Sequence, residues 1–270
     1  MQRCMWNTDR AKRRVRGLGL ALVATLASVS CEDKPTNLVT GPGTPTVASR
    51  RVIGVAELTF RDINTVNITA TATLAKNIAD LETLRSTPGA QGNLGVIQVQ
   101  PLVSSMFTNS PPDSAPQRFL RATFGLRNSP PDSIVFDALR ENLSFVLAGT
   151  ALTLPNSPIR LVEGTAASKA LAAQLTPTGL VGINGDGKLF TVDSDVLQSL
   201  TDAQLSATAV PIGASRLFPF AFPVKRPVSA TFDGVVTVGF RLPVATLPED
   251  DPTSISVLFL IVNDTGATPH

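Results

Sequence analysis

A single cysteine at the end of an apolar segment is the residue to which this sequence assigns a chemical event. Residues 17–31 read GLGLALVATLASVSC, and the basic run KRRVR stands before them at 12–16. The apolar part is shorter than the roughly 20 residues of a transmembrane helix, but it suits the h-region of an export signal. We interpret residues 1–31 as an export signal of the lipoprotein type, and Cys31 as the residue that receives a lipid through a thioether.

Two other processing routes use the same residues. Ser28 and Ser30 also satisfy the small-x-small rule for ordinary cleavage, which would release a secreted soluble protein, and a lipoprotein signal usually has leucine where Ser28 stands. The arginine pair at 13–14 could begin a twin-arginine signal, but the residues after it fit that pattern poorly. Removal of Cys4 with the signal leaves Cys31 unpaired, which lipidation explains. We therefore favour lipidation, with secretion as the alternative.

Side chains for nucleophilic catalysis are scarce. The only histidine is His270, the last residue, and the sequence contains no Ser-x-x-Lys. Ser-His-Asp and Cys-His mechanisms need a positioned imidazole as the base, so the sequence predicts that the protein is not an enzyme. A hydrolase with two carboxylates remains the alternative, because distant acids can meet in space. The acids that lie in turn-like contexts are expected to be solvated: Asp62, Asp113, Asp132, Asp250 and Asp251.

A glycine-containing loop is the candidate for a metal site. Calcium binds oxygen ligands, and Asn184, Asp186 and Asp193 have part of the spacing of an EF-hand loop. The first ligand position falls on Gly182, which has no side-chain oxygen, and Asp193 replaces the usual bidentate glutamate. We favour a tight turn that joins strands at 179–183 and 188–192. No other metal and no cofactor is expected.

Removal of the signal changes the charge of the chain. Residues 1–31 hold six of the 23 basic and one of the 21 acidic side chains, so the remainder has 17 basic and 20 acidic residues and a net charge of −3. No basic surface remains that would indicate a nucleic-acid partner. The only tryptophan is Trp6, tyrosine is absent, and all 13 phenylalanines lie beyond residue 50. The alternation of Phe218, Phe220 and Phe222 predicts one strand's contribution to a core, with an exposed aromatic patch as the alternative.

The rest of the chain has the pattern of a β protein. Residues 32–50 are rich in Pro, Gly and Thr and predict a flexible tether. Period-2 alternation over 66–74 predicts a half-buried strand that pairs with 52–60. Residues 254–262 are apolar on both faces, which indicates a central strand. Further strands are expected at 94–107, 118–127, 142–153, 205–212, 217–225, 228–232 and 235–244.

Short helices and turns separate these strands. Residues 165–175 predict a helix, Asp193 or Ser194 could cap a second one through Leu200, and 76–86 could form a third or an irregular connection. Two identical hexapeptides, NSPPDS at 109–114 and 128–133, predict strand connections because proline cannot donate to a sheet. We therefore expect a mainly β fold over 51–270: a single β-sandwich domain with one or two inserted helices.

Four segments together resemble a group of exported bacterial β-rich proteins, poorly characterised and often found with immunoglobulin-like domains. The segments are RFLRATFGLRN at 118–128, NLSFVL at 142–147, GVVTVGFRLP at 234–243 and DPTSISVLFLIVND at 251–264. The resemblance covers most of 50–265 and implies an immunoglobulin-like sandwich at the cell envelope. It supplies no active-site residues.

The sequence as a whole therefore predicts a bacterial envelope lipoprotein with a binding or structural role. Its expected location is the periplasmic or outer surface, where the lipid on Cys31 would hold it to a membrane. An envelope protein or a polysaccharide is the kind of partner that this location would offer. The alternatives in other classes are the carboxylate hydrolase and a carrier of an apolar ligand with a cavity lined by phenylalanines.

Overall fold

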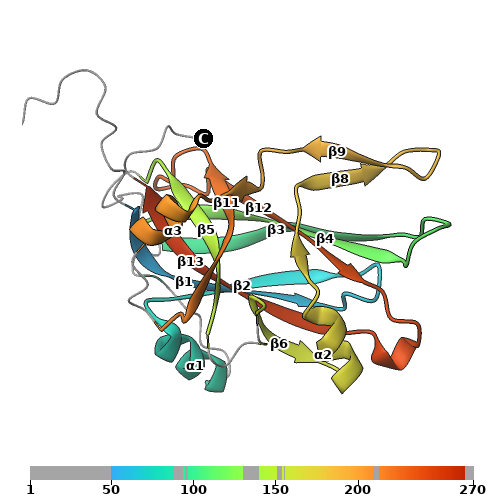
Figure 1. Cartoon of the computed structure of the whole chain (residues 1–270). Coiled ribbons are helices and arrows are strands. Elements are labelled where there is room, and N and C mark those ends of the chain that lie inside the picture. Colours follow the sequence, from blue (N-terminus) through green and yellow to red (C-terminus); the bar gives the residue numbers. More distant parts are fainter. Residues whose placement is uncertain are drawn as a thin grey trace, which may run out of the picture. The chain divides into compact units, whose positions relative to one another are not determined.

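The computed structural model describes residues 50–87, 94, 97–129, 140–150, 154, 156–208 and 213–264 (Figure 1). The expected signal with Cys31 lies outside the described residues, as do residues 32–49 of the expected tether and His270. Arg50, the last residue of that tether, already belongs to the first strand.

Most of the strands in the described part of the chain belong to one large antiparallel sheet. Eight of its strands follow one another in the order β2-β1-β13-β5-β11-β12-β4-β3, while β6, β7 and β10 pair at the sides of β13, β12 and β11. The bounds are β1 Arg50–Arg61, β2 Thr69–Ala75, β3 Ile97–Asn109, β4 Gln117–Asn128, β5 Leu143–Gly149, β6 Ile159–Glu163, β7 Thr176–Pro177, β10 Gln198–Ser199, β11 Arg216–Lys225, β12 Gly234–Pro243 and β13 Ser254–Asp264. β8 (Leu180–Ile183) and β9 (Leu189–Asp193) form a separate hairpin. The expectation of a mainly β fold is confirmed.

The large sheet curls until it is nearly closed. β11 joins its two halves, because residues up to Pro223 pair with β5 whereas Val224 and Lys225 pair with β12. The two edge strands approach each other, and Ser104 Oγ of β3 donates a hydrogen bond to the carbonyl of Ile68, just before β2 (2.8 Å). The inward side chains of both halves therefore face a common interior.

Phenylalanines fill this interior. Phe240 of β12 contacts the rings of Phe60, Phe222 and Phe259 with centroid distances of 5.6–6.3 Å, and Phe145 contacts Phe259 at 5.9 Å. All five side chains are fully buried. Edge-to-face contacts of this kind stabilise a core beyond the apolar area that they bury. Phe218 and Phe220 pack against the same core, so the predicted core role of the 218–222 segment is confirmed.

A second apolar layer covers part of the outer face of the sheet. Leu258, Leu260 and Val262 of β13 point outward there and are fully buried. Ile78 and Leu81 of α1 (Ile78–Ser86) pack against this layer, as does Leu205 of α3 (Asp202–Ala207). The prediction that 254–262 form a central strand is confirmed, because β13 pairs with β1 on one side and with β5 and β6 on the other.

Three α-helices and one 3-10 turn occur in the described part of the chain: α1, α2 (Ala166–Ala172), α3, and Pro248–Asp250. The expected helix at 165–175 corresponds to α2, and of the two alternatives for 76–86, a helix or an irregular connection, the helix forms as α1. None of these helices has the length and apolar character of a membrane-spanning helix.

Two local predictions around residue 200 are wrong. The expected helix from Asp193 to Leu200 does not form, because the Asp193 carboxylate accepts from Lys225 and from the Asp195 N–H instead of capping a helix. The expected strand at 205–212 begins instead as α3. Thr201 caps that helix: its hydroxyl accepts from Gln204 N–H, and the Gln204 side chain accepts from Thr201 N–H.

Two other boundaries differ from expectation. The strand predicted over 66–74 starts only at Thr69, and Val66 is 85 % exposed. The strand predicted at 228–232 is reduced to a single bridge between Val228 and Arg140. Asp233 accepts hydrogen bonds from Ser229 N–H and Oγ and thereby holds these residues in a turn. The first NSPPDS copy connects β3 to β4 as predicted, while residues 130–133 of the second copy lie outside the described residues.

Candidate functional site

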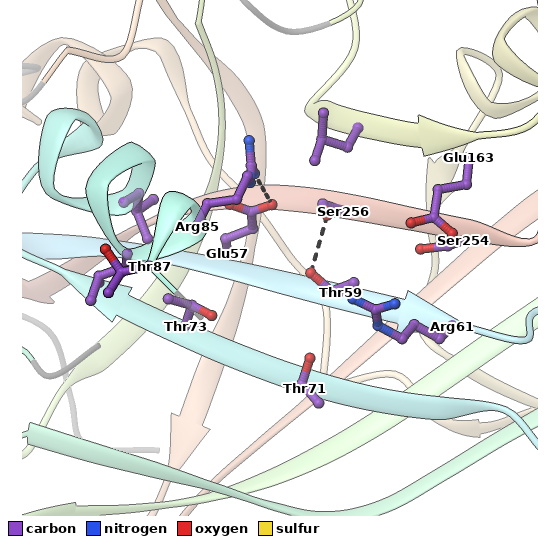
Figure 2. Close-up of a pocket in the computed structure, with 13 residues that line it drawn as sticks. Glu57, Thr59, Arg61, Thr71, Thr73, Arg85, Thr87, Glu163, Ser254 and Ser256 are labelled. Atoms are coloured by element: carbon purple, nitrogen blue, oxygen red, sulfur yellow. Dashed lines mark hydrogen bonds and ion pairs between the residues drawn. The ribbon is translucent and has the colours of Figure 1, made fainter. Parts of the chain in front are cut away.

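A polar groove of about 420 Å³ lies on the outer face of the large sheet (Figure 2). Strands β2, β1, β13 and β6 form its floor, and the C-terminal half of α1 forms one wall. The groove begins where the outward side chains of β13 change from leucine to serine. Leu258 is covered by the second apolar layer, whereas Ser256 and Ser254 line the groove.

A row of hydroxyl groups crosses the floor. The strand registers place Thr71, Thr59, Ser256 and Leu161 side by side on β2, β1, β13 and β6. The hydroxyls of Thr59 and Ser256 are hydrogen bonded to each other (3.1 Å), as Figure 2 shows. Each hydroxyl can both donate and accept, so the row offers a ligand both kinds of hydrogen-bonding group.

Strand alternation explains why these side chains face outward. Leu58 and Phe60 point into the core on either side of Thr59, and Ile255 and Val257 do the same on either side of Ser256. Successive side chains of a strand point to opposite faces, so burial of the apolar set fixes the hydroxyls on the outer face.

One end of the groove carries a network of four charged side chains. Glu57 accepts from Arg85 of α1, and the buried guanidinium of Arg160 lies between Glu57 (Nε–Oε2 3.6 Å) and Glu82, with which it also pairs. Arg85 also lies 3.4 Å from Glu82. A register shift in β6 places Arg160 at a bulge, which directs its side chain toward these acids. The network links α1, which forms the wall of the groove, to β1 and β6 of the floor.

The other end of the groove carries Arg61 and Glu163, on either side of Ser254. Neither side chain forms an ion pair with another residue that the structure describes. Glu57 on β1 pairs with Leu258 of β13, and Glu163 on β6 pairs with Ser254 of β13. The two glutamates are therefore separated by four residues along the strand direction and by two strand spacings across the sheet. That puts their Cα atoms about 16 Å apart. The carboxyl groups of a glycosidase-type pair stand about 5–9.5 Å apart.

The predicted calcium ligands lie at two ends of the β8–β9 hairpin. Asn184 and Asp186 are in its turn, where Asn184 Oδ1 accepts from the N–H groups of Asp186 (3.1 Å) and Lys188 (2.8 Å). Asp193 lies at the opposite end, paired with Leu180. The hydrogen bond from Lys225 Nζ (2.6 Å) holds the pKa of the Asp193 carboxyl below its usual value. The expected turn between two strands is present, but Asp193 ends β9 and starts no helix.

Among the residues that the structure describes, no group of three or more His, Cys, Asp or Glu side chains could hold a metal ion.

One acid that the sequence placed in a solvated turn is buried. Asp251 is 8 % exposed and forms a bidentate ion pair with Arg118 (3.0 and 2.5 Å). A second buried pair joins Arg50 to Asp264 across β1 and β13 (3.2 Å). Burial lowers the pKa of Arg50, and the charge of Asp264 opposes that shift. These pairs hold strand ends together and lie outside the groove.

The sequence contained no motif for the groove. Its residues come from four strands and a helix that lie far apart in the chain, and the register of those strands brings them together. The alternation TATAT at 69–73 was the one local signal, and it indicated only a half-buried strand.

Comparison of the chain with models of protein families, with curated proteins and with solved structures finds no match.

Proposed function

We propose that this chain is a bacterial cell-envelope lipoprotein with a non-catalytic binding role, and that the polar groove is its binding surface. The observation that carries the proposal is the row of Thr71, Thr59 and Ser256 between two charged ends. Pre-formed polar groups in a concave surface are what a hydrogen-bonding ligand requires. The lipid on Cys31 would hold the domain at the membrane, with residues 32–49 as its tether.

The chemistry of the floor favours a polysaccharide of the envelope over a protein partner. Sugars present many hydroxyls that donate and accept at once, and the Ser and Thr hydroxyls of the floor have the same dual capacity. Arg61 and Glu163 offer charged hydrogen bonds to acidic or amino substituents. The chain has no tyrosine and its only tryptophan is Trp6, so recognition in this groove would depend on hydrogen bonds and on the apolar side of Leu161.

The immunoglobulin-like architecture is part of the proposal. The two halves of the sheet, β2-β1-β13-β5-β11 and β11-β12-β4-β3, face each other across the phenylalanine core. That arrangement supports a sandwich-like domain with α1 and α3 on one outer face.

The binding role can be tested with a matched pair of variants. Thr59→Val with Ser256→Ala removes the hydroxyl pair from the floor. Thr123→Val with Thr237→Val removes a similar cross-strand pair (3.0 Å) from the other half of the sheet, outside the groove. The probes are peptidoglycan sacculi and immobilised lipopolysaccharide, with binding measured by co-sedimentation and surface plasmon resonance.

We expect the chain to bind one of these probes, the groove variant to bind it at least tenfold more weakly, and the control variant to bind it normally. Equal binding by the groove variant, or no binding of either probe by the unchanged chain, would contradict the proposal.

The anchor is tested separately. Bacteria that express the full chain are labelled with a radioactive fatty acid, and the chain is recovered by immunoprecipitation. The unchanged chain is expected to carry label and Cys31→Ser to carry none, because the thioether forms on the cysteine sulfur. Persistence of the label after this substitution would rule out the anchor, and its absence from both chains would indicate secretion instead.

A further inference from the structure

A second cavity, of about 270 Å³, lies between the β8–β9 hairpin and the outer face of β3, β4 and β12. Figure 1 shows the hairpin as a unit apart from the strands of the large sheet. The cavity has an aromatic pair on the sheet side and aliphatic side chains on the hairpin side. Its size lies just under the range of about 300–1,000 Å³ that small-molecule sites usually have. We call it the hairpin slot.

The aromatic pair is Phe107 of β3 and Phe119 of β4. The two residues are partners in the strand register, and their rings stack with centroids 4.9 Å apart and planes 9° apart. Their neighbour Leu120 points into the phenylalanine core, so the pair stands on the opposite, outer face of the sheet. Phe119 is nevertheless only 5 % exposed. Two phenylalanines on an outer face give the slot an apolar floor that is separate from the core.

Glycines form parts of both walls of the slot, and two of them allow close approaches of neighbouring atoms. A Cβ on Gly239 of β12 would lie 2.7 Å from the Thr178 carbonyl oxygen, so only glycine lets the chain that leads to β8 pass this close to the sheet. A Cβ on Gly182 would lie 2.9 Å from the ring of Phe190. On the hairpin side of the slot, Val192 of β9 lines the cavity and is 56 % exposed.

One positive charge at the slot is uncompensated. Arg121 lines the cavity and forms no hydrogen bond or ion pair with any residue that the structure describes. Asp193, whose carboxylate interacts electrostatically with Arg121, is already held by Lys225 Nζ (2.6 Å) and by the Asp195 N–H (3.0 Å). Lys225 and Asp193 cancel in charge, so the guanidinium of Arg121 leaves the slot with a net charge of +1.

We propose that the hairpin slot binds a small amphipathic anion, an apolar chain or ring that carries one carboxylate. The apolar part would lie between the Phe107–Phe119 pair and the side chains of Leu180 and Val192. The carboxylate would accept two parallel hydrogen bonds from Arg121, the geometry that a guanidinium prefers for carboxylates. This site is independent of the polar groove, which lies on the outer face of β1, β2, β6 and β13.

The test uses two probes of equal length, octanoate and 1-octanol, with binding to the full chain measured by calorimetry. Arg121→Gln removes the charge and keeps a shorter, polar side chain. Ser105→Leu fills the cavity from β3, where Ser105 is exposed and tolerates a larger side chain. Lys188→Gln, in the turn of the hairpin, removes one positive charge outside the slot. Circular dichroism confirms that each variant is folded.

We expect octanoate to bind with one site per chain, and Arg121→Gln to weaken octanoate at least tenfold while octanol binding stays the same. Ser105→Leu should abolish binding of both probes, and Lys188→Gln should change neither. Failure of octanoate to bind, or equal octanoate affinity in Arg121→Gln, would overturn the proposal. The Thr59→Val and Ser256→Ala variant should bind octanoate normally, so failure of the groove proposal and failure of this one are distinguishable.

Discussion

The ion pair of Arg118 and Asp251 is the strongest case in this chain of a charged residue with a purely structural role. Both guanidinium–carboxylate contacts are buried, at the start of β4 and just before β13. Removal of one charge leaves the other in a low-dielectric site, which costs far more than the pair contributes as a whole. The half-exposed pair of Lys225 and Asp193 lacks most of this penalty, because water reaches either partner alone.

Asp251→Asn is therefore expected to lower the free energy of unfolding by about 3–5 kcal/mol. Asp193→Asn, which breaks the half-exposed pair, should lower it by less than about 1 kcal/mol. Urea unfolding at pH 7 measures both. The double variant Arg118→Met with Asp251→Leu should lose less stability than Asp251→Asn, since it leaves no unpaired charge. A loss in the double variant as large as that of Asp251→Asn would contradict the view that the unpaired charge causes the destabilisation.

The sequence could not identify this pair. Asp250, Asp251 and Pro252 have the composition of a solvated turn, and only the arginine partner distinguishes Asp251 from its neighbour. That partner is 133 residues away in the chain, and no local pattern relates the two. The hairpin turn was predictable for the opposite reason, because Asn184 satisfies N–H groups only two and four residues ahead of it.

At the level of elements, α3 is the clearest conflict between pattern and structure. The apolar residues after Leu205 suggest a strand, yet Thr201 and Gln204 form a reciprocal capping box three residues apart. Leu205 then lies where α3 meets the second apolar layer. The capping signal was readable in the sequence, but for a six-residue helix the packing surface decides the outcome, and that surface belongs to distant strands.

Loss of the N-terminal cap should destabilise α3. Thr201→Ala removes the hydroxyl that accepts from Gln204 N–H and is expected to cost about 1 kcal/mol. Amide hydrogen exchange should show faster exchange in α3 at 202–207 while β13 exchanges at its original rate. Ser199→Ala, an exposed hydroxyl two residues earlier, is the control and should leave both rates unchanged. Equal protection of α3 in the Thr201 variant would show that packing alone maintains the helix.

The whole molecule is organised by pairings between the two ends of the described chain. β1 pairs with β13 along its entire length, and the register runs from Arg50–Asp264 to Arg61–Ser254. Alternation in the sequence predicted most of the strands, and apolar content on both faces predicted the central position of β13. The order of the strands, the closure at β2 and β3, and the polar groove all follow from non-local register, which a single sequence does not specify.

The phenylalanine core makes the two halves of the sheet interdependent. Phe240 comes from the half that contains β12, and its ring contacts Phe60 and Phe259 from the other half. Phe240→Ala would leave a cavity at the centre of this contact, and we expect it to lower the free energy of unfolding by about 3–5 kcal/mol.

The loss of stability should affect both halves of the sheet at once. Hydrogen exchange of β1 and β4 should accelerate together in the Phe240→Ala variant, because β11 belongs to both halves and neither can retain its inner face without the other. Phe190→Ala provides the matched control. Phe190 lies on the hairpin and is 50 % exposed, so its loss should cost less than about 1 kcal/mol and leave both halves protected. Acceleration in β4 alone would show that the halves unfold as separate units in spite of their shared strand.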